Sequence, residues 1–565
     1  MLALALLHRP LLVSLRLTIE WSVGRSVRSD HKPKREQDMP VALPRPLMPA
    51  PTRRLMLALL AAITVTAGTV AAPAASAAPP APPAPLGPTV TRTDQAPTGY
   101  TVTFRYQAPE DVQQVHVYGD WFYSRPENID CQDCGDARPP AEWQPGDVAA
   151  TPWHIQAMRK GPDGVWTFTT PLPAGTFRYA FTHDCTNELA TGCALHDDPA
   201  NRWQIQPQYP GAPGAVRSTI YVPASKKFPT YDTGYQAPVA KVGQLESRRY
   251  TSPLSTNPAG VHDIVVYLPH GYDPNRATPY PTLYLSHGSG DHSTAWTMQG
   301  VAHLILENAI KDRAAQPMVI VSTDFNGLPG GNEGYVNELR NNIFPFVEQN
   351  YHVSARPQDR AFAGFSAGGS RAYTIMYNHT DLFGYHAAWS AGGPAATQAQ
   401  VDSMKAVAGG IMIGTGLQDR LGNIAENSQR NAAALRAAGV ELDEFNVPGV
   451  HTWHVWRPLL DHYLRTLTFR STTTDLDVTT SSAGASHITK VTATATVGAV
   501  SASTSAPSGT VDFFAGDTHL GSARVHDGVA QLKKTVHGEL NAPVVARYQG
   551  DKLFNDSESA PVDAR

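Results

Sequence analysis

Between residues 243 and 470, short apolar runs alternate with helical stretches, and this alternation constrains the fold more than any other feature. The apolar runs are continuous rather than alternating, which is typical of strands buried on both faces. They occupy 263–268, 281–286, 318–322, 361–365, 386–390, 410–414 and 444–447. Helical stretches separate them at 301–310, 336–349, 370–378 and 427–438, the last ending at Gly439. The succession predicts a doubly wound, mainly parallel α/β sheet.

The regions on either side of this segment have β-strand patterns. Before it, polar and apolar residues alternate with period two in 100–106, 115–118, 165–168 and 177–181, and the pattern closes near 220–222. After it, a Ser/Thr/Val/Gly-rich stretch contains apolar runs at 491–497, 509–514 and 544–548. Both patterns predict all-β sandwiches. A chain of 565 residues is too long to fold around a single hydrophobic core. The predicted domains are 96–225, 243–470 and 471–565.

The N-terminal region has the pattern of a targeting segment. Arg53 and Arg54 precede an apolar stretch at 55–70, and Ala-Ser-Ala at 75–77 provides a signal-peptidase site. The stretch is short for a bilayer span, so no permanent membrane span is expected. We therefore expect a targeting region at 1–77 with a cleaved signal at about 48–77, an Ala/Pro-rich linker at 78–95, and a secreted, extracellular protein.

Charge and cysteine content narrow the classes of partner. Lys and Arg number 45 against 49 Asp and Glu, for a net charge of -4, and no basic block is present that would favour nucleic acid. All four cysteines lie within 96–225, at Cys131, Cys134, Cys185 and Cys193. In an exported protein this favours disulfides over a zinc site. Sequence proximity favours Cys131 with Cys134 and Cys185 with Cys193 among the three possible pairings.

The sequence Gly-Phe-Ser-Ala-Gly at 364–368 follows one of the predicted strands and precedes a predicted helix. A serine on such a tight turn is exposed to substrate, and the helix N-terminus favours developing negative charge. Ser366 is therefore the candidate nucleophile. An acid and a base are expected after later strands, and Asp419 follows 411–414 while His451 follows 445–447.

The expected roles follow from the chemistry of ester cleavage. His451 would accept the Ser366 proton as general base, and Asp419 would orient the imidazole and stabilise its cation. Asp443 and Glu444 are alternative acids, and His454 is an alternative base. They are less favoured because the two acids begin a predicted strand and the histidine comes three residues after His451, at the start of a predicted helical region, 456–467.

An oxyanion hole needs backbone N–H donors near the nucleophile. The N–H of Ala367, directly after Ser366, is one expected donor. The second is expected in the Gly-rich segment 287–290, with the N–H of Ser289 as the candidate. His287 is interpreted as a structural residue. This chemistry requires no metal and no organic cofactor.

The segment 243–470 resembles the esterase D and feruloyl esterase group of α/β-hydrolases, which is like carbohydrate esterase family 1 and related to enterochelin esterases and mycolyltransferase antigens. The likeness rests on 266–272, 283–288 with Trp296, 345–351, 364–369, and 451–453 with Trp456. Val450 departs from the pattern, since the family often has glycine before the histidine. The resemblance implies a serine carboxylic-ester hydrolase that forms an acyl-enzyme.

The flanking regions resemble immunoglobulin-like modules. Segments 117–121 and 164–166 are similar to early-set modules of the glycogen-binding type, although the insert around Cys131 departs from them. Aromatic side chains that could stack on sugars are interpreted first as core residues; they are Trp121, Trp153, Trp166 and Trp203. Segments 507–513 and 548–551 resemble bacterial Ig-like repeats, which are usually spacers or weak adhesins.

The expected substrates are feruloyl or acetyl esters of polysaccharides, because secretion and two accessory β-domains suit a polymeric substrate. A siderophore esterase for enterochelin-type trilactones is an alternative, and it would need a cationic pocket, for which Arg340, Arg371 and Arg420 are candidates. Mycolyltransferase-like acyl transfer and a noncatalytic surface-binding protein are further alternatives.

Overall fold

The computed structural model describes residues 84–133, 137–201, 218–228, 230–257, 260–407, 409–482 and 488–564. The predicted targeting region 1–77, Cys134 and Trp203 lie outside these ranges, so the predictions made for them stay predictions. Within the described ranges, no helix is both long enough and apolar enough to cross a bilayer.

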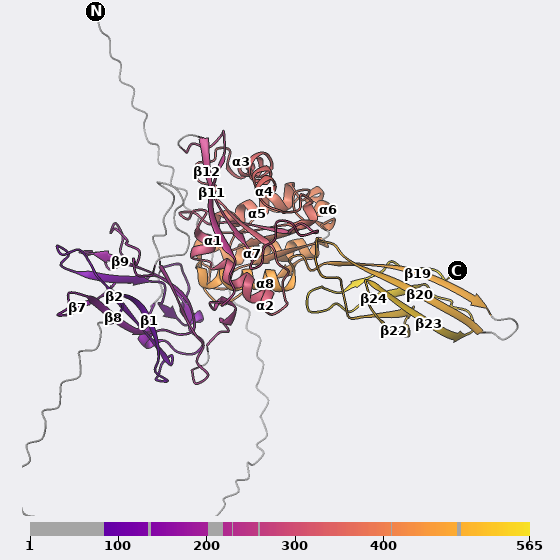
Figure 1. Ribbon diagram of the computed structural model, residues 1–565, viewed down its shortest axis with the longest axis horizontal. Coiled ribbons are helices and arrows are strands. Elements are labelled where there is room, and N and C mark those ends of the chain that lie inside the picture. Colours follow the sequence, from indigo (N-terminus) through magenta and orange to yellow (C-terminus); the bar gives the residue numbers. More distant parts are fainter. Residues whose placement is uncertain are drawn as a thin grey trace, which may run out of the picture. The chain divides into compact units, whose positions relative to one another are not determined.

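Strands β1 to β10 are called the N-terminal β-module below. Most of them belong to two antiparallel sheets (Figure 1). One sheet has the order β1 (Gly87–Arg92), β2 (Tyr100–Tyr106), β8 (Trp166–Pro171) and β7 (Arg159–Lys160). The other has the order β10 (Ser218–Val222), β9 (Gly175–His183), β3 (Val115–Gly119) and β6 (Gln156–Ala157). A short hairpin pairs β4 (Tyr123–Ser124) with β5 (Val148–Ala149).

One sequence prediction for this region was wrong. The linker predicted at 78–95 contains β1, Gly87–Arg92, which pairs antiparallel with β2 along its whole length. Although the segment is poor in large apolar residues, the backbone of a strand is satisfied by pairing with a neighbouring strand whatever its side chains are. The linker interpretation therefore fails for these residues.

The tryptophans of the β-module serve its core. Trp121 and Trp166 are buried in the same apolar cluster as Phe104 and Tyr179. The partly buried Trp153 packs against this cluster, and the guanidinium of Arg178 lies over its ring, 5.1 Å from the centroid. The prediction that these three indoles are packing residues agrees with their positions.

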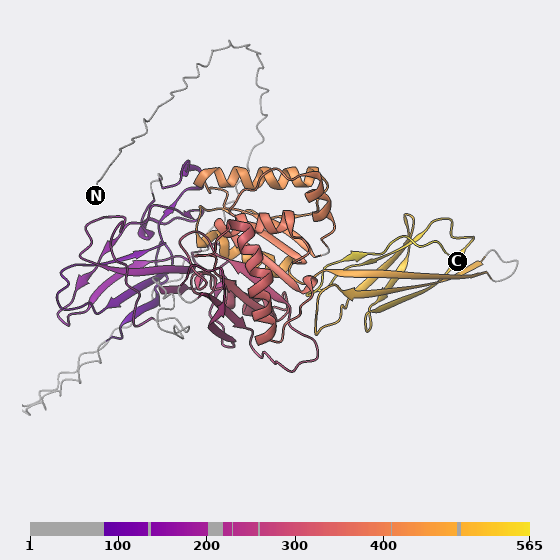
Figure 2. The ribbon, with the colours of Figure 1, turned by 90° about the horizontal axis from the view of Figure 1, so that it is seen from above.

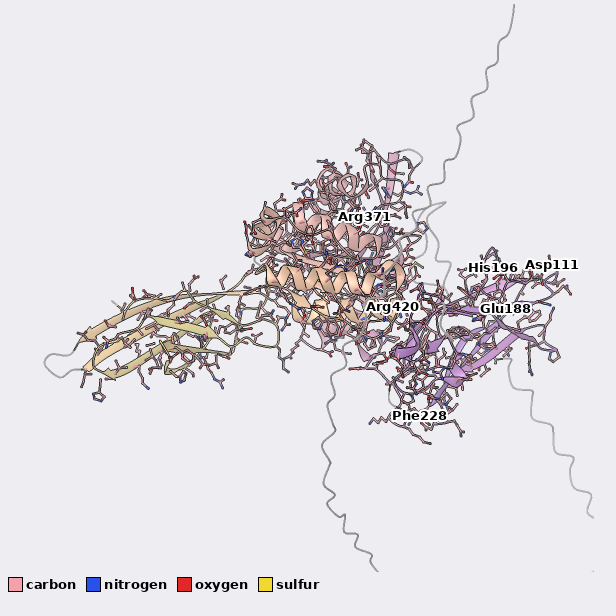
Figure 3. The ribbon with its side chains drawn as sticks, turned by 180° about the vertical axis from the view of Figure 1, so that it is seen from behind. Asp111, Glu188, His196, Phe228, Arg371 and Arg420 are labelled. Atoms are coloured by element: carbon pink, nitrogen blue, oxygen red, sulfur yellow. A yellow bond between two sulfur atoms is a disulfide. The ribbon has the colours of Figure 1, made fainter. Side chains whose placement is uncertain are left out.

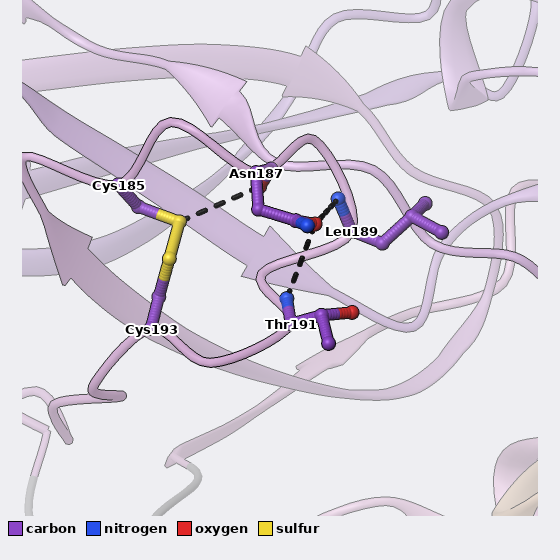
Figure 4. Close-up of a disulfide and its surroundings, with 5 residues drawn as sticks. All are labelled: Cys185, Asn187, Leu189, Thr191 and Cys193. Carbon is purple, nitrogen blue, oxygen red and sulfur yellow. Dashed lines mark hydrogen bonds between the residues drawn. A yellow bond between two sulfur atoms is a disulfide. The ribbon is translucent and has the colours of Figure 1, made fainter.

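The predicted disulfide between Cys185 and Cys193 is present (Figure 4). Asn187 organises the loop that it closes, because its Oδ1 accepts hydrogen bonds from the N–H groups of Leu189 and Thr191, at 2.9 and 3.2 Å. Cys131 is also disulfide-bonded. Its predicted partner, Cys134, lies outside the described residues.

The strands and helices from β11 to α8 are called the central domain below. This domain contains an eight-stranded sheet. Its strand order is β11 (Gln244–Thr251), β12 (Val261–Leu268), β14 (Val319–Thr323), β13 (Thr282–Ser286), β15 (Arg360–Phe365), β16 (Tyr385–Trp389), β17 (Gly410–Gly414) and β18 (Asp443–Glu444). Pairing is antiparallel where β12 meets β11 and β14, and parallel from β14 to β18. The doubly wound, mainly parallel sheet is confirmed.

The continuous apolar runs are central strands, because every residue of β13, β14, β15 and β16 is buried. The run predicted at 444–447 is shorter than expected. Only Asp443–Glu444 form β18, and Val447 joins the sheet through a single bridge to Gly416. The ladder is interrupted because the Oδ1 of Asn446 accepts the N–H of Thr415, at 3.1 Å.

Helices cover both faces of the sheet, and each face has its own apolar cluster (Figures 1 and 2). One cluster includes residues of α3 (Gly331–Glu338), α4 (Phe344–Asn350), α5 (Ala367–Asn378), α6 (Gln398–Lys405) and α7 (Ile424–Ala437). The other includes residues of α1 (Ala295–Met298), α2 (Ala302–Lys311) and α8 (Trp453–Thr466). A π-helical turn, Leu339–Ile343, joins α3 to α4.

The C-terminal domain consists of two antiparallel sheets that share one apolar core (Figure 2). They have the orders β19 (Thr472–Ser482), β20 (Ile488–Ala499), β23 (Val529–His537), and β22 (Thr518–Arg524), β21 (Thr510–Ala515), β24 (Val544–Tyr548), β25 (Ser557–Glu558). The loop after β20 contacts the central domain, since Ser501 Oγ lies 2.9 Å from Tyr385 Oη and the N–H of Ala502 donates to Asp359. Two antiparallel β-domains thus flank the central sheet, as predicted.

Candidate active site

Ser366 stands alone between strand β15 and helix α5, on a sharply bent turn. Its backbone has φ 55° and ψ -119°, which an L-residue adopts only under strain. The surrounding hydrogen bonds hold it there, because its N–H donates to Trp389 O at 2.9 Å and its carbonyl accepts from the N–H of Ser370 at 3.0 Å. A strained, partly exposed serine at this turn is the geometry that the Gly-x-Ser-x-Gly pattern predicts.

The two glycines of the pattern are needed because backbones cross here at close range. A Cβ on Gly364 would lie 2.4 Å from Gly368 O, and one on Gly368 would lie 2.4 Å from Ser286 O. No flexible side chain could move aside to relieve either contact. The glycines therefore let β15, α5 and the end of β13 pack closely around the serine.

Asp419 and His451 are hydrogen-bonded to each other. His451 Nδ1 lies 2.7 Å from Asp419 Oδ2, and the carboxylate is fully buried while 11% of the histidine side chain is exposed. With Nδ1 donating to the carboxylate, the acceptor nitrogen of a neutral imidazole is Nε2. This arrangement leaves one histidine nitrogen to take a proton from another group.

The loops that carry these two residues are bonded along their length. The N–H of Leu417 donates to Val447 O at 2.9 Å, and the N–H of Gln418 donates to Gly449 O at 3.0 Å. The side chain of Gln418 completes the pairing, since its Oε1 accepts the N–H of Gly449 at 2.8 Å. The separation of Asp419 and His451 is thus fixed by backbone bonds as well as by their own contact.

The alternative residues have other partners. Asp443 lies 2.7 Å from His462 Nε2, and Glu444 pairs with Arg436. His454 Nε2 lies 2.9 Å from Asp120 O in the β-module. None of the three takes part in the hydrogen bond that joins Asp419 and His451.

The segment 287–291 lies beside the serine and is called the 287–291 loop below. A Cβ on Gly288 would lie 3.2 Å from Ser366 Cβ and 2.5 Å from Phe365 Cε2, so the loop backbone passes directly over the turn. The N–H of Asp291 donates to Gly288 O at 3.3 Å and closes a turn around the exposed Ser289. On the other side, Ala367 is the first residue of α5, and the first four N–H groups of a helix have no partner within it.

An aromatic cluster joins the serine turn to the histidine. Phe365 stacks on Trp456 with ring centroids 3.8 Å apart, and Trp456 meets the His451 ring edge-on at 5.1 Å. Trp453 and Trp296 continue the cluster beneath Phe365. Sequence reasoning noted these tryptophans for their likeness to a family but assigned them no role.

Asp324 is a structural residue of the site that sequence reasoning missed. Its carboxylate accepts from the N–H of Ser293 and of Asn326, at 3.2 and 2.8 Å, and lies 3.1 Å from Nε2 of the buried His287. Burial opposes its ionisation, but the hydrogen bonds from His287 and His292 outweigh burial and hold the pKa of Asp324 below its ordinary value. Its position at the carboxyl end of β14 was the available signal, because ligands and site residues gather at that edge of such sheets.

The three candidate arginines are engaged in separate contacts (Figure 3 labels Arg371 and Arg420). Arg340 pairs with Asp381, and Arg420 pairs with Glu426. Arg371 lies over the Phe325 ring, 3.5 Å from its centroid, and donates to Ala367 O at 2.9 Å. They do not gather into one cationic cluster.

Two family models match parts of the chain. Residues 255–467 match the family described as "Putative esterase", and residues 478–565 match "Bacterial Ig-like domain (group 3)". The first of these segments contains every candidate residue of the site.

Several curated proteins are similar to part of the chain. An endo-1,4-beta-xylanase/feruloyl esterase of Xylanibacter ruminicola is 27% identical over 331 residues, which are 55% of this chain and 41% of that protein. Endo-1,4-beta-xylanase Y of Acetivibrio thermocellus is 31% identical over 189 residues, 32% of this chain and 17% of that protein. The chain therefore spans less than half the length of either relative.

Solved structures that match part of the chain include the feruloyl esterase module from Clostridium thermocellum. It is 24% identical with a TM-score of 0.36, and the match covers 41% of this chain and 91% of that one. The enterobactin esterase from Shigella flexneri is 17% identical with a TM-score of 0.42, and the match covers 67% of this chain and 95% of that one.

Proposed function

Residues 255–467 belong to the esterase family, and from this premise we propose that the protein is a secreted serine carboxylic-ester hydrolase with Ser366 as its nucleophile. One observation carries the proposal. The buried carboxylate of Asp419 lies 2.7 Å from His451 Nδ1, in a domain where the only strained Gly-x-Ser-x-Gly serine of the described residues precedes α5. A histidine oriented in this way is a general base for a serine hydroxyl.

The proposed reaction has two halves. His451 Nε2 takes the proton of Ser366 as Oγ attacks the ester carbonyl, and the tetrahedral oxyanion accepts hydrogen bonds from the N–H groups of Ala367 and Ser289. Collapse expels the alcohol, which receives the proton from His451, and leaves an acyl-serine. Water then attacks the acyl group with His451 again as base, so that the carboxylic acid leaves and the serine is restored.

The proposed substrates are feruloyl or acetyl esters of polysaccharides. The name of the Xylanibacter ruminicola relative combines xylanase and feruloyl esterase, which supports an ester on plant polysaccharide. The dispersed arginines also favour this class over a triply catecholate siderophore, because each guanidinium already has a partner: Asp381 for Arg340, the Phe325 ring for Arg371, and Glu426 for Arg420.

A substrate panel tests the proposal. Methyl ferulate, acetylated xylan and a catecholate trilactone are compared at equal concentrations with wild type and Ser366→Ala. We expect turnover of the first or second substrate and its loss in the variant, by about a thousandfold or more. Undiminished turnover in Ser366→Ala would refute the assignment of Ser366 as the nucleophile. A preference for the trilactone would refute the proposal of polysaccharide esters as substrates.

Secretion needs its own measurement. The protein is expressed with its own N-terminus, and the mature protein is recovered from the culture medium for N-terminal sequencing. The proposal expects cleavage after the Ala-Ser-Ala at 75–77. Retention of the whole chain inside the cell would contradict it.

A further inference from the structure

A salt bridge of the β-module faces the central domain. Asp120, 1% exposed, accepts from Arg178 Nε at 2.8 Å and from the Arg178 backbone N–H at 2.7 Å. Burial opposes ionisation of Asp120, but the positive charge of Arg178 and the contact with His454 hold its pKa below the ordinary value. The pair is therefore charged, and the guanidinium is held in a fixed orientation.

Another donor of Arg178 reaches across to the central domain. Its Nη1 donates to Gln299 Oε1 at 2.5 Å, and Gln299 Nε2 donates in turn to Asp291 Oδ1 at 2.7 Å. The two ends of one amide thus connect an arginine of the β-module with a carboxylate of the 287–291 loop. We call Asp120, Arg178, Gln299 and Asp291 the relay.

The backbone of Gln299 is anchored independently of its side chain. Its carbonyl accepts from Arg457 Nε and Nη2, at 3.0 and 2.8 Å, and Arg457 Nη1 donates to Thr176 O of the β-module at 2.6 Å. Arg457 is fully buried. The backbone of Gln299 is therefore held in place by Arg457. A substitution of the Gln299 side chain alters the relay but leaves these backbone hydrogen bonds intact.

The relay ends at the part of the loop that lies over the nucleophile. The N–H of Asp291 closes the turn on Gly288 O, and its carbonyl accepts from Asn326 Nδ2 at 2.8 Å. Gly288 passes directly beside Ser366. The orientation of Asp291 therefore bears on where the N–H of Ser289 points.

We propose that the β-module positions the 287–291 loop for catalysis through this relay, so that Arg178 and Gln299 are positioning residues although neither touches the substrate. The inference rests on the proposed esterase function. A hydrogen-bond donor that stabilises an oxyanion acts in the transition state, so its misplacement lowers kcat and leaves KM nearly unchanged.

Replacing the donor of one hydrogen bond by an acceptor, and then exchanging the two roles, tests the relay. Gln299→Glu keeps an acceptor for Arg178 but sets a carboxylate against that of Asp291, and we expect kcat for p-nitrophenyl acetate to fall about tenfold with KM within about twofold. Adding Asp291→Asn returns a donor to this contact, because the new amide can donate to the new carboxylate. The double variant should recover most of kcat.

A second substitution controls for the general cost of replacing a hydrogen-bonded glutamine by a carboxylate. Gln316 is a buried glutamine of the central domain whose Nε2 donates to Phe469 O at 2.7 Å. Gln316→Glu should lower the melting temperature and leave kcat unchanged. Hydrogen exchange of the 287–291 amides in the full chain gives a readout independent of turnover, and it should rise in Gln299→Glu and fall again in the double variant.

Each outcome decides between the alternatives. An unchanged kcat in Gln299→Glu would overturn the relay. So would an equal loss of kcat in the single and double variants with no change in hydrogen exchange of the loop. In either case, turnover by the wild type would still support the esterase function. If wild type hydrolyses no ester, the proposed function falls and the catalytic part of this inference falls with it. Exchange of the loop would still report whether the β-module holds it.

Discussion

The ring of Phe365 stacks on that of Trp456, with centroids 3.8 Å apart and planes inclined by 19°. Phe365 is the residue before Ser366, and the Trp456 ring meets His451 edge-on. One aromatic contact therefore ties the strand that leads to the candidate nucleophile to the helix that follows the candidate base. The relative position of the two groups depends on this packing as well as on the sheet.

Trp456→Leu should weaken both stability and turnover. Loss of the buried indole leaves a cavity beneath His451, and we expect about 3 kcal/mol lower stability and about tenfold lower kcat. Trp166→Leu in the β-module is the control, because that indole is about as buried, 7% exposed against 5%. Trp166→Leu should lower the stability by a similar amount without lowering kcat. Denaturant titration and steady-state kinetics measure the two effects, and equal kcat in both variants would contradict the role of Trp456.

Asp419→Asn should leave the fold intact and reduce kcat by about a thousandfold to ten-thousandfold. The amide can hold His451 in the wrong tautomer, and it cannot stabilise the imidazolium. Asp443→Asn provides the control, since Asp443 contacts His462 instead. A loss of kcat in the control as large as in Asp419→Asn would mean that the acid was misassigned.

Gly288→Ala should inactivate by steric conflict, because its Cβ would lie 2.5 Å from the Phe365 ring. Gly271→Ala is the control for adding a methyl group where no steric conflict arises. Gly271 has φ +77° with nothing within 4 Å of a Cβ, so its cost should be only about 1–2 kcal/mol with normal kcat. Normal ester turnover by Gly288→Ala would show that the 287–291 loop can move away without consequence.

Much of the architecture could be predicted because the central strands are buried on both faces. The run at 410–414 became β17 at the same residues, and the Ser, Asp, His order led to an acid and a base that are hydrogen-bonded. The edge strand β11 was missed, since its half-exposed residues lack a continuous apolar run. The strand at Gly87–Arg92 was missed because pairing of its backbone, rather than side-chain pattern, makes it a strand.

The contacts of the site with other parts of the chain could not be predicted. Asp324 follows a strand as many loop acids do, and only the structure shows His287 and the Ser293 N–H converging on it. Gln299 has no sequence signal at all, because its importance depends on Arg178, which lies far away along the chain. Contacts between distant segments require the fold itself.

Buried histidines should make stability depend on pH. Burial lowers the pKa of His386 to about 4, with its Nε2 donating to Phe383 O as a smaller, opposing effect. Above the unfolded pKa of about 6.5 both states are neutral and stability is full. As pH falls from there towards 4, only the unfolded chain gains the proton, so stability is lost.

His386→Gln should remove about 2 kcal/mol of the difference in unfolding free energy between about pH 7 and about pH 5. His303, whose pKa burial also lowers to about 4, should give a similar flattening in His303→Gln. Urea titrations followed by tryptophan fluorescence measure the difference. An unchanged pH dependence in both variants would refute the explanation.

Val450 should couple the β-module to the histidine loop. Where the resembling family often has glycine, this valine is 1% exposed and packs with Ile129, Val148 and Ala150 of the β-module. Val450→Gly should cost about 2–3 kcal/mol and lower kcat several-fold, because the residue before His451 loses its packing and gains backbone freedom.

Val497→Gly in the core of the C-terminal domain is the control, since that valine is 2% exposed and far from His451 in the sequence. It should destabilise without lowering kcat. Thermal melting and p-nitrophenyl ester kinetics distinguish the two variants. Full activity of Val450→Gly would show that the histidine loop needs no support from the β-module.

The contacts of Asp120 with both His454 and Arg178 have an evolutionary consequence. Recombination that exchanged the β-module for another would separate residues that depend on each other, and the hybrid would lose fitness before either half had changed. The β-module and the central domain are therefore expected to be inherited as one block, with paired substitutions on the two sides of their boundary. The C-terminal domain contributes no residue to the relay, so this expectation does not extend to it.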